Sequence, residues 1–169
     1  MKKEYDFSQS VKNPYFKKLK VQSCFEIADY FIWLANETGS FISNLKLQKL
    51  VYYAQAWHLA LYQTPLFEED FQAWIHGPVI PELYQKYKDY RWRPILKDVT
   101  LPKLTPDILK FLDEVAEEYF ACDSYELEQM THAEAPWNQA RENLQPDEPS
   151  DAIDVFYVVW LEPNHQLYP

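Results

Sequence analysis

The sequence predicts a mainly α fold: a single compact helical domain with a buried central helix and a small β element of one or two short strands. Its 169 residues suit one domain, because most domains run to about 100–150 residues. Only two glycines accompany twelve prolines. So few glycines cannot supply the positive-φ turns of a β-sandwich or a glycine-rich nucleotide loop. The third observation is a long helical segment, residues 45–62, that is apolar nearly all round.

The first helix is expected to begin just after a Lys-rich N-terminal arm, residues 1–20, which shows no helical period. Ser23 and Glu26 have the spacing of a capping box. The apolar positions of one helical face follow at intervals of three and four, at Ile27, Tyr30, Phe31 and Leu34. Gly39 stands where a left-handed cap would end this helix.

The central helix follows Asn44 and covers residues 45–62. One face carries Leu47, Leu50, Val51, Ala54, Trp57 and Leu61. The other faces carry Tyr52, Tyr53, Ala56, Leu59 and Ala60. A helix that is apolar all round is a buried one, so this helix should form the centre of the domain. His58 lies within it and is expected to be a hydrogen-bonded core residue rather than a ligand.

A short strand is predicted at residues 71–75, where FQAWI alternates. A turn is predicted at His76-Gly77-Pro78, because a residue before proline is pushed out of the α region. Pro81 suits the first turn of the next helix. The buried stripe of that helix should hold Ile80, Leu83, Tyr84 and Tyr87. Residues 91–104 contain two prolines and are expected to form a loop, with a second short strand as an alternative.

Three further helices are predicted in the C-terminal half. Thr105 and Pro106 are a strong helix start, and the acidic side chains of the amphipathic helix that follows should face water. Ser124 is expected to cap a shorter helix that runs through Met130. Pro136 is expected to open the third.

No internal repeat or linker divides the chain. We therefore expect one helical domain over residues 21–162, preceded by the N-terminal arm and followed by a C-terminal tail, residues 163–169. Residues 153–160 are ambiguous, because their β-branched side chains favour a strand while Asp154 can cap a last helix. We favour the helix.

Charge is unevenly distributed along the chain, whose net charge is −10. Residues 105–169 hold fifteen acidic and two basic side chains. Such a region repels phosphate, which disfavours nucleic acid as a partner. It can speed the encounter with a basic protein, or it can serve only to keep the chain in solution. The arm, with six lysines and two acids, has the opposite sign.

No sequence feature indicates a secreted or membrane protein. Cys24 and Cys122 stand alone, so a disulfide framework and a zinc knuckle are excluded. The N-terminus lacks the apolar stretch of a signal peptide, and no run of 18 apolar residues could form a transmembrane helix. We expect a cytoplasmic protein without a membrane partner.

Catalytic motifs are absent. His132 and Glu134 form a His-x-Glu pair, but the P-C-x-x-C that accompanies it in zinc deaminases is missing. The chain contains neither H-E-x-x-H nor G-x-S-x-G. We therefore expect no enzyme, no metal and no cofactor.

The aromatic residues give more information about function than the catalytic motifs do. They are more numerous than one small core needs, and Trp and Tyr dominate interface hot spots. Several of them exposed together would mark a partner surface.

Three sequence blocks, taken in order, carry a resemblance to a known family. They are LKLQKLVYYAQAWHLALY at 45–62, PLFEEDFQAWIHGPVIPELYQKYK at 65–88 and LEQMTHAEAPWNQAR at 127–141. Together they resemble the Panacea domain, the SocA-like antitoxin family that is also described as phage-associated protein. The resemblance extends over about residues 23–155.

The resemblance implies a non-enzymatic antitoxin that neutralises a cognate toxin, encoded nearby, by direct protein–protein binding. It brings no catalytic residue. The family signature falls on Lys46, Gln48, Lys49, Trp57, Trp74, His76, Gly77, Pro78, His132, Glu134, Pro136 and Trp137. We expect most of these to hold the fold, with Trp74 and Trp137 packed against the Gly77-Pro78 turn. For His132 and Glu134 we expect hydrogen bonds to the backbone, with a polar pocket that contacts a partner as the alternative.

The sequence is compatible with two other functions. One is a small-ligand or metal-dependent enzyme built around His76, His132 and Glu134. The other is a DNA-binding autorepressor, although no helix-turn-helix domain is recognisable. The oligomeric state is undetermined by the sequence, and a homodimer is compatible with it.

Overall fold

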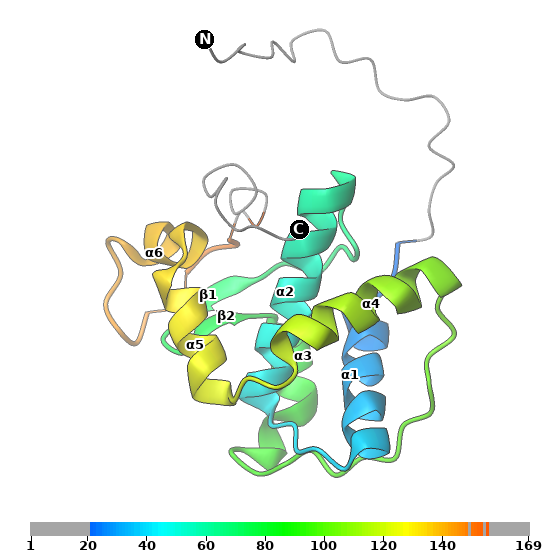
Figure 1. Ribbon diagram of the computed structural model, residues 1–169. Helices are drawn as coiled ribbons and strands as arrows, with labels where there is room; N and C mark the ends of the chain where they lie inside the picture. The colour runs from blue at the N-terminus through cyan, green and yellow to red at the C-terminus, as the bar shows by residue number, and fades with distance from the viewer. Residues whose placement is uncertain (1–20, 149, 154, 156–169) are drawn as a thin grey trace, which may run out of the picture.

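Helix α2 is the element around which the others are arranged. The computed structural model describes residues 21–148, 150–153 and 155. Within them it contains α1 (Cys24–Thr38), α2 (Asn44–Tyr62), β1 (Gln72–Trp74), β2 (Gly77–Val79), α3 (Pro81–Tyr87), the 3-10 helix η1 (Lys88–Tyr90), α4 (Pro106–Tyr119), α5 (Ser124–Ala133) and α6 (Ala135–Arg141). Helix α2 packs against α1, α3, α4, α5 and β2, and it runs through the middle of the molecule (Figure 1). The predicted mainly α class, with a small β element, is confirmed.

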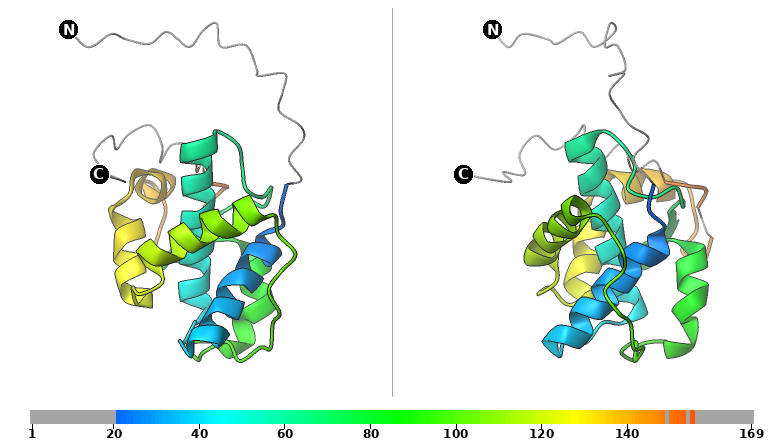
Figure 2. Two further views of the ribbon diagram at one scale, coloured as in Figure 1. Left: turned by 45° about the vertical axis from the view of Figure 1, so that its right-hand side comes forward. Right: turned by 90° about the vertical axis from the view of Figure 1, so that its right-hand side faces the viewer.

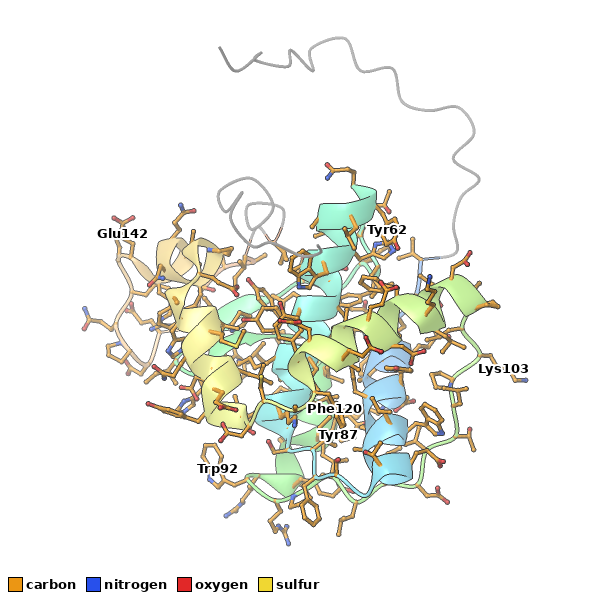
Figure 3. The ribbon with its side chains drawn as sticks, viewed as in Figure 1. Tyr62, Tyr87, Trp92, Lys103, Phe120 and Glu142 are labelled. Atoms are coloured by element: carbon orange, nitrogen blue, oxygen red, sulfur yellow. The ribbon has the colours of Figure 1, made fainter. Side chains whose placement is uncertain are left out.

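The burial of α2 follows its sequence closely. The left view of Figure 2 shows α4 lying across it, with α5 and α6 to one side of it and α1 and α3 to the other. Leu47, Leu50 and Val51 are inaccessible to solvent, as the apolar pattern predicts. Leu61 was predicted to be buried and is instead 55% exposed. The reason is that the last turn of α2 extends past the neighbouring elements, and Tyr62 lies at this protruding end (Figure 3).

Caps fix the helix boundaries. The predicted capping box of Ser23 with Glu26 begins α1, and Gly39, with a φ of 65°, ends it. Thr105 caps α4 through the amide of Ile108. The predicted cap of α5 was one residue late: Asp123, not Ser124, accepts from the first free amides of that helix. The aspartate is a good N-cap residue and forms a capping box with Glu126.

The β element is a hairpin, which corrects two expectations. Strand β1 pairs antiparallel with β2, so that Trp74 lies opposite Gly77 and Ala73 opposite Pro78. The turn therefore consists of Ile75 and His76, and Gly77 and Pro78 belong to the second strand. The alternative of a second strand within 91–104 is wrong. A proline is accepted in β2 because a two-stranded sheet leaves one side of each strand without a ladder partner.

Helix α3 and the segment after it complete the hairpin side of the molecule. Pro81 occupies the first turn of α3, as predicted. Ile80, Leu83 and Tyr87 of the expected stripe are buried, and Tyr84 is half-buried. The loop that follows is held by the amide of Ile95, which donates to the carbonyl of Ile42 (2.8 Å).

The described chain returns to the hairpin near its C-terminal end. The amide of Ile153 donates to the carbonyl of Phe71 (2.7 Å), and Ile153 and Val155 are both buried. The predicted N-terminal arm, the C-terminal tail and most of the helix expected at 153–160 lie outside the described residues.

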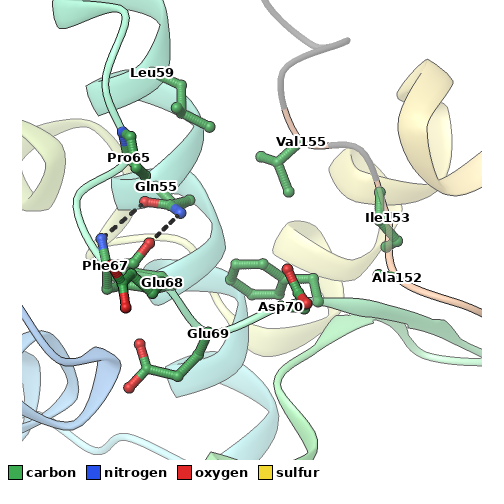
Figure 4. Close-up of a pocket in the computed structure, with 11 residues that line it drawn as sticks. Gln55, Leu59, Pro65, Phe67, Glu68, Glu69, Asp70, Ala152, Ile153 and Val155 are labelled. Atoms are coloured by element: carbon green, nitrogen blue, oxygen red, sulfur yellow. Dashed lines mark hydrogen bonds between the residues drawn. The ribbon is translucent and has the colours of Figure 1, made fainter.

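Gln55 ties α2 to the segment that leads into the hairpin. Its amide oxygen accepts from the backbone amides of Leu66 (2.8 Å) and Phe67 (3.4 Å), and its amide nitrogen donates to the carbonyl of Phe67 (2.9 Å). All of these atoms lie in a buried setting (Figure 4). One side chain thus satisfies three backbone groups that water does not reach.

Replacing Gln55 should therefore be costly. Gln55→Leu leaves two buried amides and a carbonyl without partners, and each such group costs about 1–3 kcal/mol. We expect the free energy of unfolding in urea to fall by at least about 3 kcal/mol. The control is Gln85→Leu, at an exposed position of α3, which should change it by less than about 0.5 kcal/mol. Equal effects of the two substitutions would contradict this role.

Candidate functional site

Three polar side chains near the start of α2 point into the protein and bind backbone atoms of three other elements. Lys46 Nζ donates to the carbonyl of Phe120, just after α4 (2.7 Å). Gln48 Oε1 accepts from the backbone amide that precedes α3 (2.9 Å). Lys49 Nζ donates to the carbonyl of Pro78 in β2 (2.9 Å). All three side chains are buried. They therefore connect α2 to α4, to α3 and to the hairpin.

Lys49 is the most deeply buried of the three, with no exposed surface at all. Burial disfavours the charged ammonium and lowers the pKa of Lys49 to about 7, while the Glu128 carboxylate acts in the opposite direction. Near neutral pH a substantial fraction of this side chain is therefore the neutral amine. Both forms carry N–H groups, so both can donate to Pro78.

Gly77 is the residue that lets this lysine approach the hairpin. Its φ is +96°, a conformation that residues with a Cβ rarely adopt. A methyl group at this position would also lie 2.7 Å from Thr131 Oγ1 and 2.8 Å from Lys49 Nζ. Glycine is thus required for two reasons. The backbone has a positive φ at this position, and the space between α2 and α5 has no room for a Cβ atom.

Glu134 connects α2 to the junction between α5 and α6. Its carboxylate accepts hydrogen bonds from the hydroxyls of Tyr52 (3.0 Å) and Tyr53 (2.8 Å). The Tyr53 ring stacks on Tyr119 of α4, with ring centroids 4.1 Å apart. Burial, helped by the Glu134 carboxylate, raises the pKa of both Tyr52 and Tyr53. Both hydroxyls therefore stay protonated and continue to donate throughout the physiological pH range.

His132 and Trp137 hold α5 and α6 against the hairpin. The two rings stack, with centroids 3.9 Å apart, and Trp137 Nε1 donates to the carbonyl of Trp74 at the end of β1 (2.8 Å). Burial lowers the pKa of His132, although the Glu128 carboxylate and a hydrogen bond with the backbone of Ile75 oppose it. The stacked ring of Trp137 and the hydrogen bond with the backbone of Ile75 hold His132 in place.

His76 lies apart from this packed cluster, on the exposed hairpin turn. Its Nδ1 is 2.9 Å from the Glu128 carboxylate, and the Trp92 ring stands edge-on to it with centroids 6.1 Å apart. Glu128 thus acts on both His76 and His132, whereas Glu134 is held by Tyr52 and Tyr53. Among the described residues, no group of three or more His, Cys, Asp and Glu side chains could hold a metal ion.

The other signature residues have separate settings. Trp57 lies further along α2 and donates from Nε1 to the hydroxyl of Tyr119 (2.8 Å). Pro136 is buried in the first turn of α6. His58, predicted to be a hydrogen-bonded core residue, is buried and donates from Nδ1 to the carbonyl of Thr64 (2.7 Å), which confirms that prediction. No described helix has the length and the apolar composition needed to cross a membrane.

Several residues with comparable roles were missed by the sequence analysis. Arg141 Nη1 donates to the carbonyl of Ala73 in β1 (2.7 Å). Asn44 Nδ2 donates to the carbonyl of Tyr84 in α3 (3.2 Å). Gln55 holds the segment before the hairpin, as described above. For Asn44 and Gln55 a signal was present in the sequence: both are polar positions in a helix that is otherwise apolar nearly all round.

A groove opens beside this cluster, between the start of α2, the hairpin and α3. Gln48, Trp74, Ile75, His76, Tyr84 and Trp92 are among the residues that line it, and its volume is about 240 Å³. We call it the hairpin groove. Lys88 and Arg91 lie at its edge, and the lining contains no acidic side chain.

A second hollow lies on another side of the hairpin, between the C-terminal half of α2 and the residues Ala152, Ile153 and Val155 (Figure 4). Its volume is about 480 Å³. Glu68, Glu69 and Asp70 line it together with apolar side chains such as Phe67 and Val155. The two hollows therefore differ in charge: the hairpin groove is edged by basic residues and this one by acidic residues.

Comparison with known proteins gives one family. The sequence model of the family described as antitoxin SocA-like, Panacea domain, matches residues 47–138, which is more than half of the chain. The match begins in α2 and ends in α6, so it covers the whole cluster around Lys49, Gly77, His132 and Glu134 except Lys46. No curated protein and no solved structure matches the chain.

The two glycines provide a matched test of the role of Gly77. Both have positive φ values, but an added methyl group would meet nothing within 4 Å at Gly39. We expect Gly39→Ala to lower the free energy of unfolding by about 1–2 kcal/mol, from backbone strain alone. Gly77→Ala should cost about 2–5 kcal/mol, because overpacking against Lys49 and Thr131 is added. Chemical denaturation measures both, and equal losses would contradict the close approach at Gly77.

The lowered pKa of Lys49 predicts a pH dependence of stability. Its folded value is about 7 and its ordinary value 10.5, so between these pH values the unfolded chain binds more protons than the folded chain. Stability should therefore rise with pH in this window, by up to about 1.4 kcal/mol per pH unit. Above about pH 9 the ionisation of unfolded cysteines and tyrosines, whose folded pKa values are raised, acts in the opposite direction.

Urea denaturation at pH 7, 8 and 9 measures this slope. Lys49→Met should remove most of it, whatever the substitution does to the absolute stability, because the lysine with the larger pKa shift is gone. A smaller slope should remain from Lys46, whose pKa is also lowered by burial. The control is Lys110→Met, at an exposed position of α4, which should retain the slope of the unmodified protein. If the full slope survives in Lys49→Met, another group is responsible for it.

Proposed function

Because this chain belongs to the SocA-like antitoxin family, whose Panacea domain it matches over residues 47–138, we propose that it is a non-enzymatic antitoxin. It neutralises a cognate toxin, encoded nearby, by binding it directly in the cytoplasm. The family match is the observation that carries this proposal.

The state of the polar signature residues supports a binding role. Lys49, His132 and Glu134 are the side chains whose chemistry would suit catalysis. Lys49 is bonded to Pro78 in the interior, His132 is stacked on Trp137, and Glu134 is held by two tyrosines. Side chains engaged in this way contribute to the shape of the domain, and the shape is what a binding protein offers to its partner.

The surface offers two features that suit a protein partner. Trp92 is an exposed aromatic side chain, of the type that forms interface hot spots. The net charge of −10 creates a field that attracts a basic toxin over a distance and speeds the first encounter.

Co-expression with the adjacent open reading frame tests the proposal. We expect that frame, induced alone, to stop growth of the host, and induction of this chain to restore colony formation to the level of an empty vector. A frameshifted copy of this chain, carrying the same nucleotides, should not restore growth. The proposal fails if the adjacent frame is harmless alone, or if it stays toxic in the presence of the intact chain.

Direct binding is tested with the purified proteins. The two chains should elute together from a size-exclusion column, apart from either protein alone. Restored growth without a complex would support an indirect mechanism instead, such as repression of the toxin gene.

A further inference from the structure

The mouth of the hairpin groove exposes large apolar side chains. Trp92 is 75% exposed and Ile75 51% exposed, and both line the groove. Leaving such surface in water costs free energy that burial against a partner recovers. Trp is also among the residue types that contribute most to protein interfaces. These side chains therefore provide the means to hold another protein.

The size of the groove indicates what enters it. Pockets for small-molecule ligands usually have volumes of about 300–1,000 Å³, whereas the hairpin groove has about 240 Å³. It is therefore suited to one large apolar side chain rather than to a cofactor or a metabolite. Trp74, Tyr84 and Val79 line it and offer apolar surface to such a side chain.

Trp92 is presented by a turn whose geometry is fixed. Arg91, at the end of η1, has φ 54° and ψ −117°, a strained conformation for a residue with a side chain. The Arg91 amide donates to the carbonyl of Lys88 (3.0 Å), and the Arg93 amide to the carbonyl of Tyr90 (2.9 Å). Strained residues of this kind cluster at active sites, ligand clamps and switch regions. A turn already held in shape loses less conformational entropy when a partner binds.

The charge around the groove has the opposite sign to the charge of the chain. Lys88, Arg91 and Arg93 are exposed on this turn beside a single acid, Asp89, while the whole chain carries −10. His76 adds little, because Glu128 pairs with it. A local basic edge on an acidic protein favours an acidic segment of a partner and repels a basic one.

We propose that the hairpin groove is the anchor site for the toxin: it takes one large apolar side chain, flanked in the toxin sequence by acidic residues that meet Lys88 and Arg91. This rests on the proposed function, and it deepens it by naming the surface and the chemistry of the segment bound. The negative charge of the rest of the chain then attracts other, basic parts of the toxin. The first encounter and the final anchoring therefore use different surfaces of this protein.

Two pairs of variants, made in the full chain, test the site. Trp92→Ala removes the exposed ring, and Lys88→Glu with Arg91→Glu reverses the charge at the edge. Tyr125→Ala is the control for the first, since Tyr125 is 68% exposed on α5. Lys103→Glu with Lys110→Glu is the control for the second, and Lys103 lies on the opposite side of the molecule from Trp92 (Figure 3). All four should unfold at the same urea concentration as the unmodified protein.

With the adjacent toxin as partner, Trp92→Ala should weaken binding by at least about thirtyfold, as expected for the loss of a hot-spot residue. The charge reversal should weaken it at least tenfold and reduce its dependence on salt. The two controls should bind like the unmodified protein. If both groove variants bind and neutralise normally, the proposed site is wrong while the antitoxin function stands.

A peptide probe tests the site independently of any toxin. The probe is a fluorescein-labelled decapeptide of Asp and Glu with one central Phe; one matched peptide has Ala at the centre, and another has Lys in place of every acid. The acidic Phe peptide should bind at least tenfold tighter than either of the others, and only to protein with an intact groove. Absence of binding up to millimolar concentration, or equal binding to Trp92→Ala, would overturn the proposal.

The peptide result also separates the two proposals. If the chain fails to neutralise the adjacent gene product but binds the acidic Phe peptide through Trp92, the antitoxin function is wrong and the chemistry of the groove is right. If Trp92→Ala instead converts a dimer of this chain into a monomer, the groove is occupied by a second copy, which would overturn the assignment to a toxin.

Discussion

The contact between α2 and the hairpin constrains the rest of the structure. Lys49 reaches the carbonyl of Pro78 from inside the protein, and it can do so only because Gly77 has no side chain there. A buried lysine without a hydrogen-bond partner is costly, so the surrounding elements must lie close enough to give its nitrogen a partner. The lowered pKa of Lys49 reflects the same burial. The position of the hairpin relative to α2 is thereby fixed.

Once the hairpin is fixed, α5 and α6 have little freedom. The indole of Trp137 bonds to the end of β1, and Glu134 bonds to two tyrosines of α2. The junction between these short helices is therefore attached both to the hairpin and to α2. Helices of seven and ten residues are too short to be stable alone, so these attachments determine where they lie.

Most of the fold could be predicted from the sequence, but the polar cluster inside it could not. Apolar periodicity locates α1, α2 and α4, and prolines mark the starts of α3 and α6, because these signals act within one element. The second strand, β2, was not predicted, because Gly77 and Pro78 were assigned to the turn and a Gly-Pro pair is typical of turns. The pairing of two strands depends on the geometry of the turn between them. Lys49 was expected to matter only through the family resemblance. Its burial depends on how α2, the hairpin and α5 come together in space, and no local pattern encodes that.

The division between buried and exposed residues has a consequence for recognition. Lys49, Gly77 and Thr131 have little or no surface that a partner could touch, so they influence binding only by holding the hairpin in place. Under the proposed function, direct contacts with the toxin come from exposed positions such as Ile75, on the hairpin turn, and Trp92, both outside the signature. Substitutions at the buried positions should therefore reduce stability and binding together, whereas those at the groove should reduce binding alone. Because the hairpin turn projects from the same strands that Lys49 holds, the packing of the core sets the shape of the surface that we propose to bind the toxin.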